Sequence, residues 1–540
     1  MSKIIEFGPD ARQKLVTGID KIADAVVATL GPNGRNVVIS KPGQTPQSTK
    51  DGVTVAKSIS LEDPTEELGV QMLKQAAIKT ADKAGDGTTT STLLAREIVK
   101  NGLKRLDDGA NAVDIKRGID HAVEQVIHHL TPFQQDISSQ EQLTQVATIS
   151  ANNDETVGKL ISKAMEKVGR EGVVHIEESK TGETYLETVE GMQFNRGYKS
   201  PYFVTNNNTM STTLDDVYVL IADHTFNSVK ELLPILESVS NTSKSLLIIA
   251  KDVDNEALAT LIVNKMRGTL KVCAVKAPDF GDRQKLVLED IAVLTGGQVF
   301  SKEKGMKLEK FSWEWFGEAR VSTITKEKTT IVDGKGQEDA ITARVEELSK
   351  QIEKADTPFE TERLQDRMSK FVGGVAIVHV GGNTETEMNE RKDRVDDALN
   401  ATKAAIEEGI LPGGGVALVR ATQFVESDGN DDFEFGVEIV KTACKKPFEQ
   451  ILLNAGYPQD VISKYTLELD GNDWTGFDIK QNKMVDFKEA GIIDPFKVTR
   501  SALQNASSIA GTILLTEATI VDKPSDNNQP QIDPSMMGMM

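Results

Sequence analysis

The sequence has few cysteines, few aromatic residues and no long hydrophobic run. Two cysteines, Cys273 and Cys444, occur among 540 residues. This is too few for a disulfide framework and indicates a reducing compartment. Aromatic residues make up only 5% of the chain, so its cores have to be built mainly from aliphatic side chains. The uncharged segment 501–516 contains amides and hydroxyls that are costly in lipid, so we expect no membrane span.

Targeting signals and an excess of positive charge are also missing. The start of the chain, MSKIIEFGPDARQK, lacks the apolar run of a signal peptide and the arginine and serine bias of a transit peptide. The formal net charge of −20 argues against nucleic acid or an anionic membrane as the main partner, because both require clustered lysine and arginine. These features predict a soluble, cytoplasmic protein.

Several common catalytic motifs are absent. The sequence contains no G-x-x-x-x-G-K-[ST], which excludes a P-loop NTPase, and no full G-x-G-x-x-G dinucleotide motif. It also lacks the G-x-S-x-G of a nucleophile elbow. The six histidines do not have the spacing of a metal site, and we expect them at the surface or lightly packed.

The length and the hydrophobic periodicity predict a multidomain α/β protein. A chain of 540 residues exceeds what one core usually supports, so two to four domains are expected. The N-terminal part is mainly helical, with helices expected at 11–30, 68–84 and 89–101 and a short strand at 37–40. The middle alternates strands with helices around a buried sheet, with strands expected at 217–222, 246–250 and 271–275 and helices at 229–239, 255–267 and 283–294. A strand at 375–380 and helices at 385–408 and 416–424 follow, and composition changes near Gly191 and Gly373 suggest that the middle is an insert.

The segment 84–91, AGDGTTTS, carries the strongest local signal for a ligand. It leads directly into a predicted helix, whose first N–H groups and partial positive charge suit a phosphate. Its glycines allow close approach, its threonines add hydroxyls, and Asp86 offers a hard oxygen for Mg²⁺. For this segment alone, the ordinary alternative is a helix capped by aspartate or threonine. The segments 29–35, 50–54 and 413–415 have matching chemistry, and each by itself could equally be a surface turn.

In this order, the motifs resemble those of the group I chaperonins, the GroEL family. The resemblance covers residues 2–523 and rests on 28–35 (ATLGPNGR), 50–57 (KDGVTVAK), 85–90 (GDGTTT), 148–152 (TISAN), 190–194 (EGMQF), 196–203 (RGYKSPYF) and 411–415 (LPGGG). It implies a ring-forming ATPase that uses ATP, Mg²⁺ and K⁺ and folds other proteins in an enclosed cavity. The implied partners are unfolded or partly folded client proteins, further copies of the chain in a single or double heptameric ring, and a GroES-type co-chaperonin.

The resemblance also implies three discontinuous domains. A mainly α-helical equatorial ATP-binding domain would comprise residues 1–133 and 409–540, and a small α/β intermediate domain would comprise 134–190 and 375–408. An α/β apical substrate-binding domain would comprise 191–374. The implied hinges are Gly191, Gly374 and Gly409, and glycine is suited to this role because it tolerates large backbone changes.

The family's nucleotide-site residues carry over to matching positions. The implied nucleotide-binding residues are Thr29, Leu30, Gly31, Pro32, Lys50, Asp86, Gly87, Thr88, Thr89, Thr90, Gly414, Asp478, Ile479 and Asp494. Asp86 would bind Mg²⁺, and K⁺ would lie near Thr29, Lys50 and Thr89. Asp397 and Asp51 would be the catalytic carboxylates. Without the resemblance, Asp397 is one of many charges on a solvated helix.

The resemblance further implies a face that binds client proteins. Its residues are Tyr198, Ser200, Tyr202, Phe203, Leu233, Leu236, Leu258, Ile262 and Val263. The helical spacings within this set are equally compatible with apolar residues that face the core of their own domain.

Four departures from the family pattern and three alternatives complete the interpretation. Asp136 stands where the family often has a hinge proline, and Asp478 replaces a base-contacting asparagine. Glu449 stands where we expect an arginine that helps to join two rings, which leaves a single ring open, and the tail 536–540 lacks the repeated Gly-Gly-Met of many relatives. One alternative is an ATP-independent holdase, against which the intact Asp51, Asp86 and Asp397 argue. The others are an unrelated kinase or transferase, and a group II chaperonin, for which no lid insertion is evident.

Overall fold

The structure is a computed structural model that describes residues 2–40, 46–169, 173–179, 181–189, 191–207, 209–242, 244–308, 311–354, 357–372, 375–469 and 474–523. The chain forms two compact units, of which the first comprises Met1–Ser162 with Gly382–Met540 and the second comprises Lys163–Gly381. The three-domain division remains a prediction. Within the described residues, no helix combines the length and the apolar character needed to cross a bilayer.

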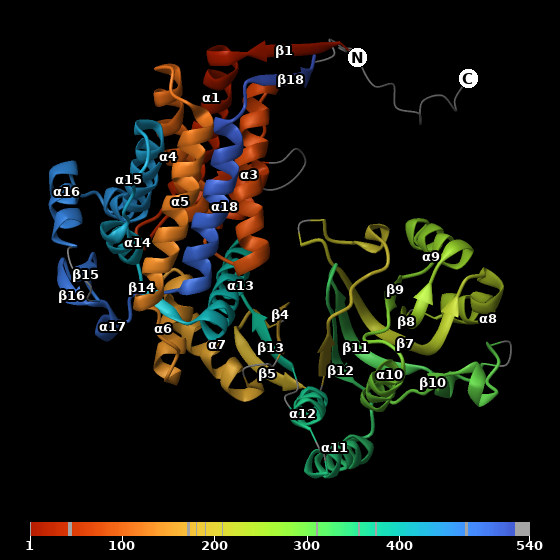
Figure 1. Cartoon of the computed structure of the whole chain (residues 1–540). Coiled ribbons are helices and arrows are strands. Elements are labelled where there is room, and N and C mark those ends of the chain that lie inside the picture. The colour runs from red at the N-terminus through yellow and green to blue at the C-terminus, as the bar shows by residue number, and fades with distance from the viewer. Residues whose placement is uncertain are drawn as a thin grey trace. The chain divides into compact units, whose positions relative to one another are not determined.

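The first unit is a bundle of long helices that joins both ends of the chain (Figure 1). Helix α5 packs against α15, α18 against α4, and α1 against α3. The bounds of these helices are α1 (Gly8–Val27), α3 (Pro64–Ala84), α4 (Thr88–Asp107), α5 (Ala112–Leu130), α15 (Asp431–Asn454) and α18 (Phe496–Leu514). The three predicted N-terminal helices are therefore confirmed, with ends that differ by a few residues.

Glycines allow two of these helices to touch closely. A Cβ atom on Gly118 of α5 would lie 2.0 Å from the carbonyl oxygen of Phe433, and one on Gly436 of α15 would lie 2.2 Å from that of Ile115. Such contacts are possible only without a side chain, so the backbones of α5 and α15 approach each other more closely than helices usually do.

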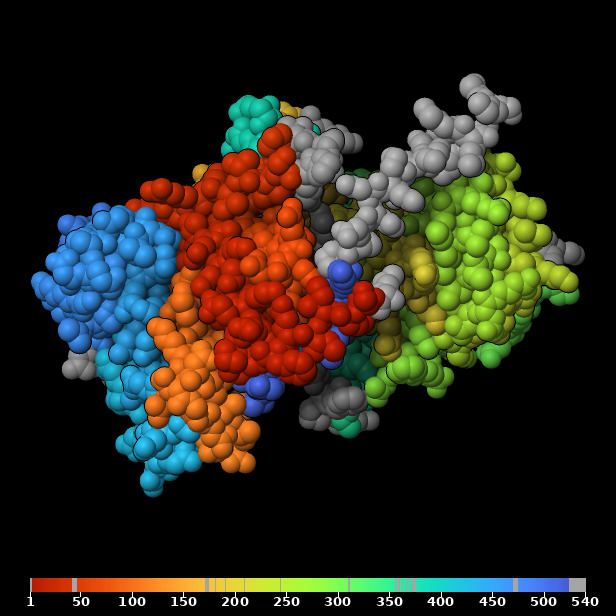
Figure 2. All heavy atoms as spheres, turned by 90° about the horizontal axis from the view of Figure 1, so that it is seen from above, coloured from red at the N-terminus to blue at the C-terminus, as the bar shows by residue number. Residues whose placement is uncertain are grey.

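The two ends of the described chain meet in one small sheet. Strand β1 (Lys3–Phe7) pairs antiparallel with β18 (Ala518–Asp522). Figure 2 shows the same proximity at the surface, where red N-terminal and blue C-terminal atoms adjoin in the first unit. The other elements of this part are the long helix α13 (Glu385–Glu408), α7 (Glu155–Val168), which continues into the second unit, and the shorter β2 (Val37–Ile39), β3 (Gln47–Thr49), α2 (Gly52–Ser58), α6 (Gln140–Ser150), β14 (Ile410–Pro412), α14 (Val416–Ala421), α16 (Gln459–Glu468), β15 (Thr475–Asp478), β16 (Lys483–Asp486), α17 (Phe487–Ala490) and β17 (Ile493–Pro495).

The second unit is built around a seven-stranded sheet with the order β6-β12-β11-β7-β8-β9 and with β10 beside β7. The pairs β7–β8, β8–β9 and β7–β10 are parallel, whereas the pairs β7–β11, β11–β12 and β12–β6 are antiparallel. The bounds are β6 (Gly191–Phe194), β7 (Thr212–Phe226), β8 (Ser245–Val253), β9 (Val272–Lys276), β10 (Val299–Phe300), β11 (Gly317–Ile324) and β12 (Thr329–Gly334). The predicted strands are confirmed, and so are the helices between them, α8 (Val229–Ser240), α9 (Asn255–Met266) and α10 (Asp282–Thr295).

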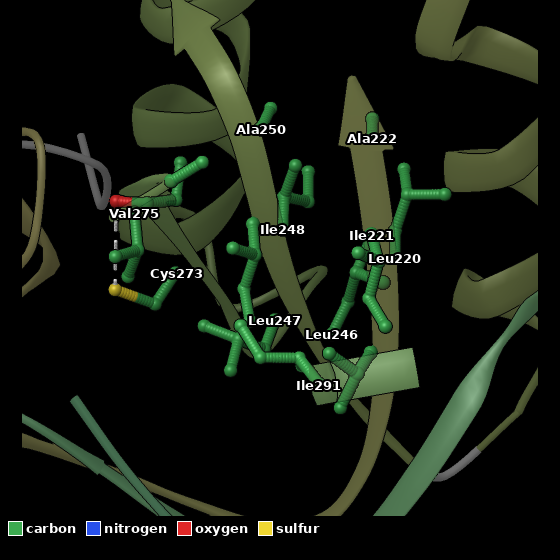
Figure 3. Close-up of a cluster of buried hydrophobic side chains, with 14 of the residues drawn as sticks. Leu220, Ile221, Ala222, Leu246, Leu247, Ile248, Ala250, Cys273, Val275 and Ile291 are labelled. Carbon is green, nitrogen blue, oxygen red and sulfur yellow. Dashed lines mark hydrogen bonds between the residues drawn. The ribbon is translucent and has the colours of Figure 1, made fainter. Parts of the chain in front are cut away.

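Aliphatic side chains from both faces of this sheet form the core of the second unit. Leu246, Leu247 and Ile248 of β8 are completely buried, and Figure 3 shows them between Leu220 and Ile221 of β7 on one side and Val275 of β9 on the other. A strand that is covered on both faces has apolar residues at successive positions. The apolar run at 246–250 therefore predicts a buried strand correctly.

A smaller sheet in the second unit places a histidine in its interior. Strand β13 (Val375–Val380) lies between β4 (Val173–Glu178) and β5 (Tyr185–Val189), and helices α11 (Glu338–Glu353) and α12 (Pro358–Val372) precede it. His379 is buried, stacks on Tyr185 and shares a hydrogen bond of 2.8 Å with Glu187. The expectation of surface or lightly packed histidines is therefore wrong for His379, because β13 is the central strand.

Candidate functional site

A cavity of about 860 Å³ in the first unit brings together segments that are far apart in the sequence. Every predicted nucleotide-site and catalytic residue lines it, namely Thr29, Leu30, Gly31, Pro32, Lys50, Asp51, Asp86, Gly87, Thr88, Thr89, Thr90, Asp397, Gly414, Asp478, Ile479 and Asp494. The packing of α4 against α3 and α18, and of α13 against the same two helices, positions these segments around one space.

The N-terminus of α4 forms one wall of the cavity. Gly85 ends α3 with φ 75° and Gly87 precedes α4 with φ 85°, a left-handed backbone that glycine adopts readily. Among the described residues, no side chain caps α4, and its first intrahelical bond runs from Ser91 N to Gly87 O at 2.9 Å. The amides of the preceding threonines therefore lack intrahelical acceptors. The alternative of an ordinary capped helix is wrong, and this end suits an anion.

Asp86 is held between the two glycines. Its carboxylate accepts a hydrogen bond from the amide of Gly87, and Ser150 lines the same cavity. Burial raises the pKa of Asp86 above its ordinary value, and repulsion from Asp51 adds to the effect. A carboxylate in such surroundings is stabilised when a cation binds nearby.

The corner between β3 and α2 packs onto the start of α4. Asp51 caps α2, because its oxygens accept from Val53 N at 3.0 Å and from Thr54 N at 2.9 Å. A Cβ atom on Gly52 would lie 2.5 Å from Thr89 Oγ1, so only glycine allows this contact. Asp51 thus has a structural role in addition to any role in chemistry.

The end of α1 contributes the turn at Thr29, Leu30 and Gly31. Gly31 adopts φ 82°, and a side chain of α15 holds the turn from outside. Asn454 Nδ2 donates to the carbonyl oxygen of Val27 at 3.0 Å and to that of Leu30 at 2.9 Å. The sequence motif alone contains no sign of this contact, because Asn454 is brought to the turn only by the packing of α15.

The opposite side of the cavity combines bare backbone with aromatic rings. Gly414 adopts φ 62°, and the nearest atom to a Cβ placed there is Phe487 Cε2 at 4.0 Å, so its missing side chain leaves open space. Asp494 lines the same region, and the nearby amides of Gly414 and Gly415 act against the rise in its pKa. Asp478 is buried and accepts from Lys480 N at 2.8 Å, and Phe477 and Phe487 line the same region. An apolar wall with a few polar groups suits a flat heterocyclic ring.

Helix α13 contributes Asp397 and a second carboxylate that the sequence interpretation missed. Burial raises the pKa of Asp397 well above its ordinary range, and repulsion from Asp86 and Asp51 raises it further. Asp393 also lines the cavity. It precedes Asp397 by four residues, and this spacing, which puts both on one helix face, was visible in the sequence.

The comparisons with known proteins agree with this geometry. The family model of the TCP-1/cpn60 chaperonins matches residues 22–524. The chain belongs to the TCP-1/cpn60 chaperonin family. A solved structure with the same fold is that of the chaperonin gp146 from the bacteriophage EL 2 (Pseudomonas aeruginosa) in the presence of ATP-BeFx, with a TM-score of 0.66 and 23% identity over 96% of this chain and 100% of that chain. The fold is thus the multidomain α/β chaperonin fold, and membership of the family supports a chaperone role.

Two of the three expected hinge glycines lie among the described residues. A Cβ atom on Gly191 would lie 2.5 Å from the carbonyl oxygen of Ile331, and one on Gly409, which has φ 73°, would lie 2.6 Å from that of Gln135. Both positions therefore require glycine for space, and a hinge role stays a prediction. Gly374 lies outside the described residues.

The residues of the expected client-binding face differ in their exposure. Tyr202, Leu233 and Val263 are 65%, 46% and 43% exposed. Leu258 and Ile262 are partly buried against the core of the second unit. The remaining four are buried: Tyr198, Ser200, Phe203 and Leu236.

The expectation of an exposed apolar face is therefore wrong for these four. Phe203 and Leu236 have their side chains in the core, where helix α8 and the short 3-10 helix Pro201–Phe203 turn them inward. Tyr198 belongs to the same core. The Ser200 hydroxyl accepts from Tyr202 N at 3.4 Å and so caps that short helix.

The acidic side of the cavity predicts a pH-dependent stability. Burial, with repulsion from Asp86, raises the pKa of Asp494 from 3.8 to about 7. Between these values the folded protein binds the proton more tightly than the unfolded chain, so stability falls as pH rises. We expect Asp494→Asn to be more stable than the unsubstituted protein above about pH 7, by about 1–2 kcal/mol after allowance for solvent screening.

Thermal unfolding of the nucleotide-free protein from about pH 5 to about pH 8 checks this expectation. Asparagine has nearly the same shape as aspartate, so we expect the packing around position 494 to be retained. Unfolding curves that shift equally with pH in both proteins would contradict it.

Proposed function

We propose that the chain is a subunit of a group I, GroEL-type chaperonin: a cytoplasmic, ring-forming ATPase that binds non-native proteins and promotes their folding. The observation that carries this proposal is the single cavity that combines the uncapped end of α4 with Asp51, Asp86 and Asp397. An anion site with several carboxylates beside it suits a nucleoside triphosphate with its cations better than a simple anion.

In this proposal, ATP binds with its phosphates at the start of α4. The free amides and hydroxyls of Thr88, Thr89 and Thr90 receive the phosphate oxygens, and Lys50 adds a positive charge. The ribose and base lie toward Gly414, Asp494, Asp478 and Ile479, where Phe477 and Phe487 supply an apolar wall. The similar phage chaperonin was crystallised in the presence of ATP-BeFx, which supports a nucleotide as the ligand.

The residues fit the cations that such a nucleotide requires. Among the described residues, no group of three or more acidic, histidine or cysteine side chains could hold a metal ion by itself, as expected for ions that take most ligands from a triphosphate. Asp86 would hold Mg²⁺, and K⁺ would lie near Thr29, Lys50 and Thr89. Bound cations would neutralise phosphate charge and relieve the repulsion that raises the pKa of Asp86.

Hydrolysis requires a water molecule to be aligned with the terminal phosphate. Asp397 would orient this water and accept its proton as the oxygen attacks phosphorus and the bond to the bridging oxygen breaks. Burial and the neighbouring carboxylates raise the pKa of Asp397, so its ionised form is a stronger base than an ordinary aspartate. Asp51 would assist at the terminal phosphate while it caps α2.

Client binding would use the exposed apolar side chains Tyr202, Leu233 and Val263. In the proposed cycle, the intermediate domain closes over the bound ATP, with Gly409 as its hinge to the equatorial domain. The apical domain turns about Gly191 and Gly374. A pair between Arg196 and Glu385 of neighbouring subunits would couple the ring. A GroES-type lid would close the chamber.

The first prediction concerns turnover. We expect Asp397→Asn to lower kcat for ATP by about 10²-fold or more, because the amide cannot accept a proton. The affinity for nucleotide should change little. Phosphate release and nucleotide titration measure the two quantities, and equal background rates of phosphate release with and without Asp397 would instead indicate an ATP-independent holdase.

The second prediction concerns client capture. Tyr202→Glu and Leu233→Ser should abolish the capture of a chemically denatured protein while ATP turnover persists, because both side chains are exposed. Leu236→Ser is the matched control. It should destabilise the second unit by about 3 kcal/mol or more, since Leu236 is only 5% exposed. Capture that survives Tyr202→Glu and Leu233→Ser would refute this face.

The third prediction concerns assembly. Negative-stain images should show end views with sevenfold symmetry, and monomers under all conditions would refute the architecture. Side views decide between one ring and two. A single ring is open because Glu449, which pairs with Lys446 of its own helix at 2.8 Å, stands where an arginine that helps to join two rings is expected.

A further inference from the structure

Helix α3 carries a buried lysine that the proposed reaction does not use. Lys74 is only 8% exposed, and lysine is seldom buried so deeply because its ammonium group loses contact with water. Burial lowers the pKa of Lys74, and the charge of Glu67 opposes this lowering. A cation in such a place needs polar partners, and Lys74 finds them in the backbone that follows α2.

Lys74 binds the carbonyl groups at the end of α2. Its ammonium nitrogen donates to the carbonyl oxygen of Ile59 at 2.5 Å and to that of Lys57 at 3.5 Å. The last carbonyls of a helix lack intrahelical donors and carry partial negative charge, so a cation at this end is favourable. Lys74 therefore caps the C-terminal end of α2 from a neighbouring helix.

Glu67 holds the residues that come next in the chain. Its carboxylate accepts a hydrogen bond from the amide of Leu61 at 2.7 Å. Glu67 and Lys74 are seven residues apart, which places them on one face of α3. One side chain thus binds carbonyls of the segment 57–61 and the other binds an amide, so the segment is fixed to α3 at two points. We call Lys74 and Glu67 the α3 clamp.

Helices α2 and α3 both lead to the cavity. Helix α2 begins directly after Asp51, and a Cβ atom on Gly52 would lie 2.5 Å from Thr89 Oγ1, so this end packs against the start of α4. Helix α3 ends at Gly85, the residue before Asp86. Because α2 is only 7 residues long, a shift at its C-terminal end would also move its start. The α3 clamp therefore anchors the far end of the element that presents Asp51.

We propose that Lys74 is a positioning residue for ATP hydrolysis: together with Glu67 it fixes α2 to α3 and thereby holds Asp51 in the cavity beside Asp86. This inference rests on the proposed function and adds two residues to it. Neither Lys74 nor Glu67 is among the residues that line the cavity, so both act through α2.

Substitutions of lysine in the full chain test the first contact. Lys74→Met keeps most of the side-chain length and removes the donor. We expect it to lower kcat for ATP about tenfold, because a small misplacement of a catalytic group is costly. The affinity for ADP, which lacks the terminal phosphate, should change less than about threefold. Lys79→Met, which replaces an exposed lysine of the same helix, is the matched control and should leave both quantities unchanged.

Substitutions of glutamate test the second contact. Glu67→Ala removes the acceptor for the amide of Leu61 and should lower kcat in the same direction. Glu67→Gln keeps an acceptor oxygen, so kcat should stay within about threefold of that of the unsubstituted protein. If Glu67→Gln is as slow as Glu67→Ala, the hydrogen bond to Leu61 is not the cause, and the proposal is overturned.

A double mutant separates positioning of Asp51 from general damage. Asparagine also caps helices well, so Asp51→Asn should keep α2 folded while it removes the carboxylate. If Lys74 acts through Asp51, adding Lys74→Met to Asp51→Asn should slow single-turnover hydrolysis by less than about twofold. Losses that multiply in the double mutant would show that Lys74 acts by another route, and would refute the proposal.

Hydrogen–deuterium exchange gives a readout that does not require ATP turnover. Loss of the α3 clamp should increase exchange of the amides of residues 52–61 in Lys74→Met and Glu67→Ala, but not in Lys79→Met or Glu67→Gln. If the unsubstituted protein does not hydrolyse ATP, the proposed function fails, and this exchange pattern still decides whether the clamp exists. Unchanged exchange in Lys74→Met would overturn the clamp even in an active ATPase.

Discussion

The uncapped N-terminus of α4 is the constraint on which the first unit depends. Several described helices begin at a side-chain cap, as Asp51 caps α2 and Asn111 caps α5. At α4 the flanking glycines take left-handed backbone conformations, and no described side chain satisfies the first amides. The unmet hydrogen bonds make this end a strong site for an anion. The neighbouring segments, including Gly52 against Thr89, are packed so that this end stays accessible from the cavity.

The carboxylates around this end are arranged for binding rather than for stability. Asp86, Asp397 and Asp494 all have raised pKa values, with burial as the leading cause and other carboxylates close by. Without a ligand, their ionisation opposes folding. Cations held by a bound nucleotide would offset the repulsion among these carboxylates. The residues that destabilise the nucleotide-free protein would then stabilise the nucleotide-bound protein.

Several parts of the structure could be predicted from local sequence. The strand at 375–380 and the helix at 385–408 have the predicted bounds, since their apolar run and polar caps are local signals. The residues of the cavity could be named because a family resemblance preserves their order. Asn454 could not be assigned a role, because its partner, the turn after α1, comes from a distant segment.

By itself, the sequence determined which segments become helices and strands, and which residue types could meet a phosphate. Only the tertiary structure decided which apolar side chains of a helix face inward. Leu233 and Leu236 stand three apart on α8, yet the first is 46% exposed and the second 5%. Helical periodicity places both near one face, and the sheet beneath that face then covers one and leaves the other to solvent. Burial depends on what packs against a residue, and that partner is supplied by another part of the chain.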